Sequence, residues 1–236
     1  MIEKIITVTL YSFCITVFAV WAIIYIPFLL VFGPNKSTWL RRLYAQFMIK
    51  AGFNKLVIIN APPPNRGPYL FVMNHQSLFD GFMLAAVLPY HFSILAKKEI
   101  FSLPLFGFII RRLGFIPLDR KNYNDSLSSL SQAAEKIKSG IPVAIFPEGT
   151  RTKNGQIGLF KKGAFRLAFE AKAIIVPAGI TGSYHCQPSG QRLLRPGVLK
   201  INFGQPMSYD SYSSLAIFEL SDLVKKQIIE LSNDHL

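Results

Sequence analysis

The stretch YLFVMNHQSLFDGFMLAAVL, residues 69–88, passes directly from a strand pattern to a helix pattern. Its first six residues, YLFVMN, predict a strand. Its last eight residues, GFMLAAVL, predict a helix. A strand that leads into a helix is the building unit of an α/β fold, and the polar residues between the two elements lie at the carboxyl end of the strand.

The same alternation continues along the chain. Further strands are predicted at KLVIIN (55–60), FSILA (92–96), FIPLD (115–119), IPVAIF (141–146), IIVPAGI (174–180) and VLKINFG (198–204). Helices are predicted between and after them, at 126–139 with Asp125 as N-cap, at 161–173 and at 215–231. We therefore expect residues 53–236 to form one α/β domain with a mixed, mostly parallel sheet flanked by helices.

An uncharged apolar segment, IITVTLYSFCITVFAVWAIIYIPFLLVFG, precedes this domain at residues 5–33. As a helix of about 28 residues it would be about 42 Å long, whereas a bilayer core needs only about 20 residues. It is long enough to span with tilt, to bend at Pro27, or to insert into one leaflet. Gly33, Pro34 and Asn35 are expected to break the helix.

A second helix is predicted at STWLRRLYAQFMIKAG, residues 37–52, with apolar residues at helical spacing. Arg41, Arg42 and Lys50 are expected on the rest of its surface. A basic amphipathic helix after an apolar one favours a two-helix hairpin in a membrane interface, although the second helix alone would also pack on a domain. We therefore expect residues 1–52 to form membrane-anchoring helices.

Charge also indicates the kind of partner and the side of the membrane. The chain has 26 basic and 13 acidic side chains, a formal net charge of +13, which favours an anionic partner. Basic residues Lys36, Arg41 and Arg42 follow the apolar segment and only Lys4 lies close before it, which predicts a cytoplasmic location for the domain. The two cysteines, Cys14 and Cys186, form neither a disulfide framework nor a zinc-binding spacing.

Two polar clusters follow predicted strands, where ligands of α/β sheets bind. In NHQSLFD, Ser77 and Asp80 have the spacing of a helix capping box. The same residues permit a catalytic pair, with His75 as general base and Asp80 as its orienting carboxylate. In FPEGTR, a turn with a Glu148–Arg151 ion pair competes with a site for substrate hydroxyls. Arg120, after FIPLD, is either a surface charge or a phosphate ligand.

Four ordered blocks carry a resemblance to a known family. NHQSLFD resembles the NH-x4-D signature of glycerolipid acyltransferases of the 1-acyl-glycerol-3-phosphate acyltransferase (PlsC) type. GFIPLDR, FPEGTR and VPAGI resemble the second, third and fourth blocks of that family, in the same order and with similar spacing. The resemblance covers roughly residues 55–207 and implies a fold like that of glycerol-3-phosphate acyltransferases.

The resemblance implies a role for each matching residue. His75 is the implied general base and Asp80 its orienting partner. The implied substrate-binding positions are Arg120 for the acceptor phosphate, Glu148 and Gly149 for the acceptor, Thr150 and Arg151 for the shape of that pocket, Pro177 for the acyl-donor site or its support, and Lys97 and Lys98 for anionic substrate or lipid headgroups. The segment after Thr181 matches the family only loosely.

The implied reaction is transfer of a fatty acyl group from acyl-CoA or acyl carrier protein to the sn-2 hydroxyl of lysophosphatidate. A thioester has a good leaving group, so a general base without a covalent acyl-enzyme suffices, and no G-x-S-x-G motif is present. Backbone amides near His75 are one candidate for the oxyanion donors, which the sequence does not locate. We expect no metal, no further cofactor and no nucleic-acid partner, and an anionic inner membrane as the surface bound.

Two alternatives remain open at this point. The first is an acyltransferase that acts on another lysophospholipid. The second, from a different class of protein, is a non-catalytic basic protein that binds membranes.

Overall fold

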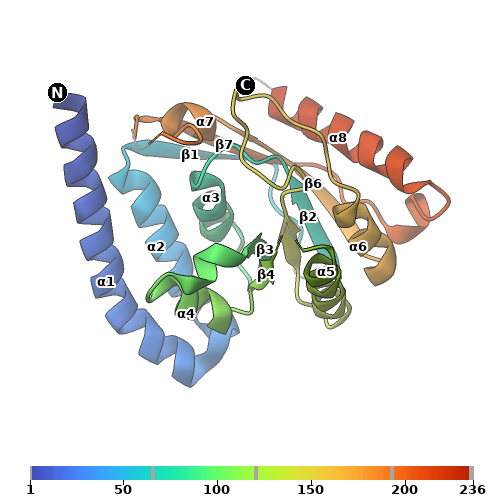
Figure 1. Cartoon of the computed structure of the whole chain (residues 1–236), viewed down its shortest axis with the longest axis horizontal. Helices are drawn as coiled ribbons and strands as arrows, with labels where there is room; N and C mark the ends of the chain where they lie inside the picture. The colour runs from blue at the N-terminus through green and yellow to red at the C-terminus, as the bar shows by residue number, and fades with distance from the viewer. Residues whose placement is uncertain (1, 65–66, 120–121, 192–193, 234–236) are drawn as a thin grey trace.

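The structure is a computed structural model that describes residues 2–64, 67–119, 122–191 and 194–233 (Figure 1). Its centre is a seven-stranded sheet with the order β1-β7-β6-β2-β5-β3-β4. The strands are β1 (Asn54–Ile59), β2 (Tyr69–Met73), β3 (Ser93–Lys97), β4 (Ile116–Leu118), β5 (Val143–Ile145), β6 (Ile174–Thr181) and β7 (Gly197–Phe203). Each predicted strand is therefore confirmed, with ends that differ from the predicted ones by at most two residues.

The sheet is mixed and mostly parallel, as predicted. Five strands, β6, β2, β5, β3 and β4, run in the same direction, whereas β7 is antiparallel to β6 and β1 is parallel to β7. The carboxyl ends of those five strands therefore meet at one edge of the sheet. The loops that follow β2, β5 and β6 all leave the sheet at this edge. Residues of these three loops can therefore meet in one site.

The helices are α1 (Ile2–Lys36), α2 (Thr38–Ala51), α3 (Phe79–Val87), α4 (Phe106–Arg112), α5 (Tyr123–Lys138), α6 (Gly163–Ala171), α7 (Ser183–Cys186) and α8 (Ile217–Asn233), with short 3-10 helices η1 (Lys98–Ser102) and η2 (Tyr209–Ser211). Asn122, and not Asp125 as predicted, caps α5, because its side chain accepts the amides of Asn124 and Asp125.

Helices cover both faces of the sheet (Figure 1). Leu70 and Val72 of β2 are buried with side chains of α5, α6 and α8 on one face. Phe71 and Met73 are buried on the opposite face with side chains of α2 and α3. Alternate side chains of a strand point to opposite faces, so a central parallel strand between two helical layers is apolar throughout. This explains why the predicted strand at residues 69–74 shows no alternation.

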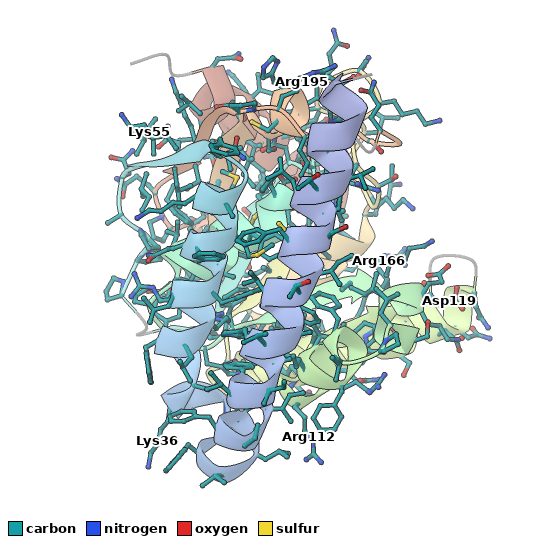
Figure 2. The ribbon with its side chains drawn as sticks, turned by 90° about the vertical axis from the view of Figure 1, so that its left-hand side faces the viewer. Lys36, Lys55, Arg112, Asp119, Arg166 and Arg195 are labelled. Atoms are coloured by element: carbon teal, nitrogen blue, oxygen red, sulfur yellow. The ribbon has the colours of Figure 1, made fainter. Side chains whose placement is uncertain are left out.

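α1 is long and apolar enough to cross a membrane over Thr7–Lys36; its most apolar 18-residue stretch has a mean hydropathy of 2.5 and is only 17% buried. Ile15, Ile23 and Val31 expose 66%, 73% and 73% of their surface. Gly33 interrupts the helix with a φ of 74°, as predicted. Figure 2 shows α1 beside α2, and α1 also packs on α4 through Tyr25 and Ile109.

α2 exposes apolar side chains and buries one of its arginines. Trp39, Leu43 and Phe47 are exposed by 53%, 55% and 43%, whereas Arg41 is 7% exposed. The prediction of a surface position was therefore wrong for Arg41. The exposed apolar side of α2 adds to that of α1, and both lie on the same side of the molecule (Figure 2).

The buried Arg41 binds the end of α3. Its Nη2 donates to the carbonyl oxygens of Leu88 and Tyr90 at 3.1 Å each, and its guanidinium lies 4.4 Å from the centroid of the Phe92 ring. The last carbonyls of a helix lack partners and carry partial negative charge, which a cation stabilises. Burial lowers the pKa of Arg41 to about 10, so the side chain remains charged at neutral pH.

The boundary expected between the membrane-anchoring helices (residues 1–52) and the α/β domain (residues 53–236) stays a prediction.

Candidate functional site

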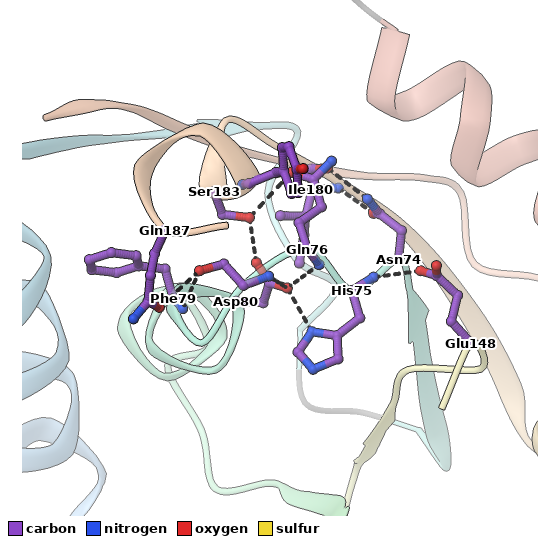
Figure 3. A network of polar contacts seen from close by, with 11 residues as sticks. Asn74, His75, Gln76, Phe79, Asp80, Glu148, Ile180, Ser183 and Gln187 are labelled. Atoms are coloured by element: carbon purple, nitrogen blue, oxygen red, sulfur yellow. Dashed lines mark hydrogen bonds and ion pairs between the residues drawn. The ribbon is translucent and has the colours of Figure 1, made fainter. Parts of the chain in front are cut away.

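The site lies where the loops after β2, β5 and β6 meet at the carboxyl edge of the sheet (Figure 3). The loop after β2 carries His75, the loop after β5 carries Glu148, and the turn after β6 carries Ser183. Segments separated by more than 100 residues are joined here by hydrogen bonds.

His75 and Asp80 form the predicted pair. His75 Nδ1 lies 2.7 Å from Asp80 Oδ2, and the side chains are 18% and 0% exposed. Because an ionised carboxylate only accepts hydrogen bonds, the imidazole proton lies on Nδ1 and Nε2 keeps its lone pair. The histidine is therefore held in the tautomer that a general base requires.

Asp80 also closes the predicted turn. Its Oδ2 accepts the amides of Gln76 at 2.6 Å and Ser77 at 2.9 Å, in addition to the imidazole. The turn that the capping interpretation predicts is thus present, and the same carboxylate contacts the imidazole. Catalysis by this pair stays a prediction. Phe79 N donates to Ser77 Oγ at 3.3 Å. The start of α3 therefore positions the carboxylate that orients His75.

The sequence did not identify three further residues of this network. Asn74 exchanges two hydrogen bonds with the backbone of Ile180, at 2.8 and 2.7 Å, and Gln76 Oε1 accepts the amide of Tyr184 at 3.3 Å. Ser183 Oγ donates to Asp80 Oδ1 at 2.6 Å. Asn74 and Gln76 lie inside the NHQSLFD motif, but the sequence assigned neither of them a role in the site. Ser183 lies in the segment that matches the family loosely.

The backbone of His75 is held from both sides by the loop after β5. His75 N donates to Glu148 Oε1 at 2.7 Å, and His75 O accepts the amide of Thr152 at 2.8 Å. The imidazole also stacks on Phe146, with ring centroids 4.1 Å apart and an angle of 21°. The loop that contains the FPEGTR block therefore orients the histidine.

Glu148 has a structural position that the sequence did not reveal. Its Oε2 accepts the amide of Gly158 at 2.9 Å, so each carboxylate oxygen binds a backbone N–H. Burial raises the pKa of Glu148, and the two amide hydrogen bonds oppose that shift. Among the described residues no ion pair joins Glu148 to Arg151. Its implied contact with acceptor hydroxyls stays a prediction.

Glu148→Gln is expected to lower kcat by about tenfold, because the new NH2 group faces a backbone donor and one amide loses its acceptor. The KM for the acceptor is expected to change less than twofold, since the loss acts through the position of His75. Steady-state kinetics measure both values. Glu219→Gln is the matched control, because Glu219 also accepts a backbone amide, that of Ala216 at 2.7 Å, at the start of α8. A large rise in KM with unchanged kcat would show direct acceptor binding instead.

The next three residues of the FPEGTR block, Gly149, Thr150 and Arg151, belong to the same loop. Gly149 has a φ of +70°, and a Cβ added there would lie 2.9 Å from Cε of Lys161. The structure thus explains this glycine by a left-handed backbone and by the Lys161 side chain that covers it. Thr150 is exposed and Arg151 is half-buried.

Lys97 and Lys98 lie at the end of β3, on the same edge of the sheet as His75. Lys97 Nζ pairs with Glu99 at 3.1 Å, and Lys98 Nζ pairs with Asp119 at 3.3 Å. No ion pair or hydrogen bond recorded within the described ranges joins either lysine to the His75 network. Their implied contacts with anionic groups remain predictions.

Pro177 is buried within β6, opposite Val72 of β2. Its carbonyl oxygen accepts the amide of Gly204 at 2.8 Å. This position agrees with the structural-support alternative of its two implied roles. Arg120, the implied phosphate ligand, lies outside the described residues.

The three backbone amides at and directly after His75, which are candidate oxyanion donors, already donate to carboxylates. His75 N is bound by Glu148, and the amides of Gln76 and Ser77 are bound by Asp80. Such amides stabilise an oxyanion only when they point at it. In the part of the chain that the structure describes, no three His, Cys, Asp or Glu side chains are grouped as a metal site.

A family model described as Acyltransferase matches residues 56–181. The chain is 32% identical over 187 residues to 1-acyl-sn-glycerol-3-phosphate acyltransferase LPAT1 of Arabidopsis thaliana, a chloroplastic protein; the match covers 77% of this chain and 52% of that protein. It is 31% identical over 226 residues to 1-acyl-sn-glycerol-3-phosphate acyltransferase alpha of Mus musculus, covering 91% of this chain and 78% of that one. The chain thus spans about half the length of the Arabidopsis protein.

The fold is similar to the crystal structure of the 1-acyl-sn-glycerophosphate acyltransferase PlsC from Thermotoga maritima. The TM-score is 0.82 at 24% identity, with 99% of each chain covered. The family model includes His75, Asp80, Glu148 and Pro177 and extends over more than half of the sequence. This chain therefore belongs to the acyltransferase family, and the relatives named above are 1-acyl-sn-glycerol-3-phosphate acyltransferases.

Proposed function

We propose that this protein transfers a fatty acyl group from a thioester, acyl-CoA or acyl carrier protein, to the sn-2 hydroxyl of lysophosphatidate. The product is phosphatidate, a precursor of phospholipids. The observation that carries the proposal is the His75–Asp80 pair, with its 2.7 Å contact at the carboxyl edge of the sheet. The names of the relatives indicate the acceptor.

The proposed mechanism uses His75 as general base. Nε2 removes the proton of the acceptor hydroxyl while the hydroxyl oxygen forms a bond to the thioester carbonyl carbon. Asp80 stabilises the imidazolium that results. When the tetrahedral intermediate collapses, the C–S bond breaks and the imidazolium returns the proton to the departing thiolate. The acyl group passes directly between the substrates, and histidine ends in its starting form.

We propose that the basic side chains and the apolar helices together hold the site at a membrane. The net charge of +13 suits lysophosphatidate, the phosphates of CoA and anionic lipids. The exposed apolar sides of α1 and α2 provide the contact with lipid. No metal or other cofactor enters the mechanism.

A cytoplasmic location for the domain also belongs to this proposal. Arg41 is buried, so the charge argument rests on the less buried Lys36 and Arg42 against Lys4. Protease added outside sealed cells is expected to leave residues 53–236 intact. Cleavage within that range would contradict the proposed side.

A panel of acceptors tests the function. The full chain in detergent micelles is given acyl-CoA or acyl carrier protein with lysophosphatidate, lysophosphatidylcholine or lysophosphatidylethanolamine, and thiol release is followed. We expect a preference of about tenfold or more in kcat/KM for lysophosphatidate, as for a site that pairs with a phosphate monoester. A preference for another lysolipid would overturn the acceptor assignment. Absence of thiol release with every pair would favour a non-catalytic membrane-binding protein.

A further inference from the structure

We propose that Ser183 is a positioning residue that fixes the carboxylate of Asp80 and thereby the general base. This inference rests on the proposed function, since it assigns Ser183 a role in the same reaction. Ser183 follows β6 and lies 103 positions after Asp80 in the chain. It is brought to the catalytic pair only by the sheet (Figure 3).

The contact is short and fully buried. Ser183 Oγ donates to Asp80 Oδ1 at 2.6 Å, and both side chains are 0% exposed. Hydrogen bonds to an ionised acceptor are shorter and stronger than neutral ones, and water does not compete for them in a buried site. Ser183 Oγ also lies 3.3 Å from Gln76 Oε1, a weaker contact for the same proton.

The backbone around Ser183 leaves it little freedom. Gly182 has a φ of +83°, and a Cβ added there would lie 1.9 Å from the carbonyl oxygen of Val198. On the other side, the two hydrogen bonds between Asn74 and Ile180 join the end of β6 to the loop of His75. The turn is therefore held against the catalytic loop independently of the serine hydroxyl.

The division of donors between the carboxylate oxygens shows what Ser183 adds. Oδ2 of Asp80 accepts His75 Nδ1 and the amides of Gln76 and Ser77, whereas the recorded donor to Oδ1 is Ser183. Without that donor, the Asp80 carboxylate is freer to rotate, and the hydrogen bond between Oδ2 and His75 Nδ1 loses its alignment. The loss would appear in kcat, because the substrates do not contact Ser183 in the proposed mechanism.

The test compares Ser183→Ala with a matched control, Ser93→Ala. Ser93 is also 0% exposed, and its Oγ donates at 2.6 Å, but to the carbonyl oxygen of Gly114 in the turn before β4. We expect Ser183→Ala to lower kcat by about tenfold with less than twofold change in either KM. Ser93→Ala is expected to keep kcat within about twofold. Melting temperatures of both variants record the loss of stability that they share.

A double-mutant cycle separates positioning from general support. In the Asp80→Asn background, Ser183→Ala is expected to cost less than about twofold, because the carboxylate it orients is gone. If Ser183→Ala does not fold, Ser183→Cys keeps the volume with a weaker donor and is expected to give an intermediate kcat. An equal cost in both backgrounds, or a loss equal to that of Ser93→Ala, overturns the proposal. Inactive wild type would instead refute the proposed function itself.

Discussion

His75→Ala is expected to lower kcat by about a thousandfold, the scale of a general base that acts in the rate-limiting proton transfer. No other base has been placed at the hydroxyl, and water at neutral pH is a poor substitute. The imidazole is 18% exposed and its backbone is held by Glu148 and Thr152, so we expect the variant to fold. Thiol release with saturating acyl donor and lysophosphatidate measures the effect.

The control for this experiment is His185→Ala. His185 is exposed on α7 and contributes no hydrogen bond to the site among the described contacts. It is expected to retain wild-type kcat within about twofold, as for a surface change remote from the chemistry. Full activity of His75→Ala would refute the general-base mechanism, because that mechanism requires the imidazole to take the proton of the acceptor hydroxyl.

Asp80→Asn is expected to lower kcat by about a hundredfold or more and to destabilise the protein as well. A carboxamide presents only one acceptor oxygen, whereas Asp80 accepts hydrogen bonds from four donors through two oxygens. Its NH2 group would therefore face either Ser183 or the amides of the turn. In the second arrangement the imidazole also loses the acceptor that holds its proton on Nδ1.

The stability part of this prediction has its own measurement. A buried donor left without a partner costs about 1–3 kcal/mol, and denaturant unfolding is expected to show a loss of about that size. Asp210→Asn, at an exposed position of η2, is the matched control and should change neither stability nor kcat. An Asp80→Asn variant with near-normal kcat would mean that the carboxylate only caps the turn.

The hydrogen bonds of Glu148 indicate a structural role for the FPEGTR block in this protein. Family resemblance implied substrate contacts for Glu148, but the recorded partners of its oxygens are the amides of His75 and Gly158. The FPEGTR block thus holds the backbone of His75, which belongs to the NHQSLFD block. The two loops follow the neighbouring parallel strands β2 and β5, so a substitution in either loop is expected to affect the position of His75.

The features that could be predicted from the sequence are those with a local physical cause. The seven strands follow from apolar runs of strand length between turn residues, and the apolar α1 follows from length and composition. His75 and Asp80 also interact locally, because a turn into a helix brings residues of that spacing together. Each of these depends on residues near one another in the chain.

The tertiary structure alone decided which distant groups meet. Arg41 belonged by pattern to a solvated surface, but the carbonyl oxygens of Leu88 and Tyr90, just after α3, bind it in the interior. Ser183 carried no local signal, yet the parallel placement of β6 beside β2 brings it to Asp80. Sequence periodicity and residue chemistry determine which side chains can donate or accept. The order of strands in the sheet determines which partner, far away in the chain, each of them finds.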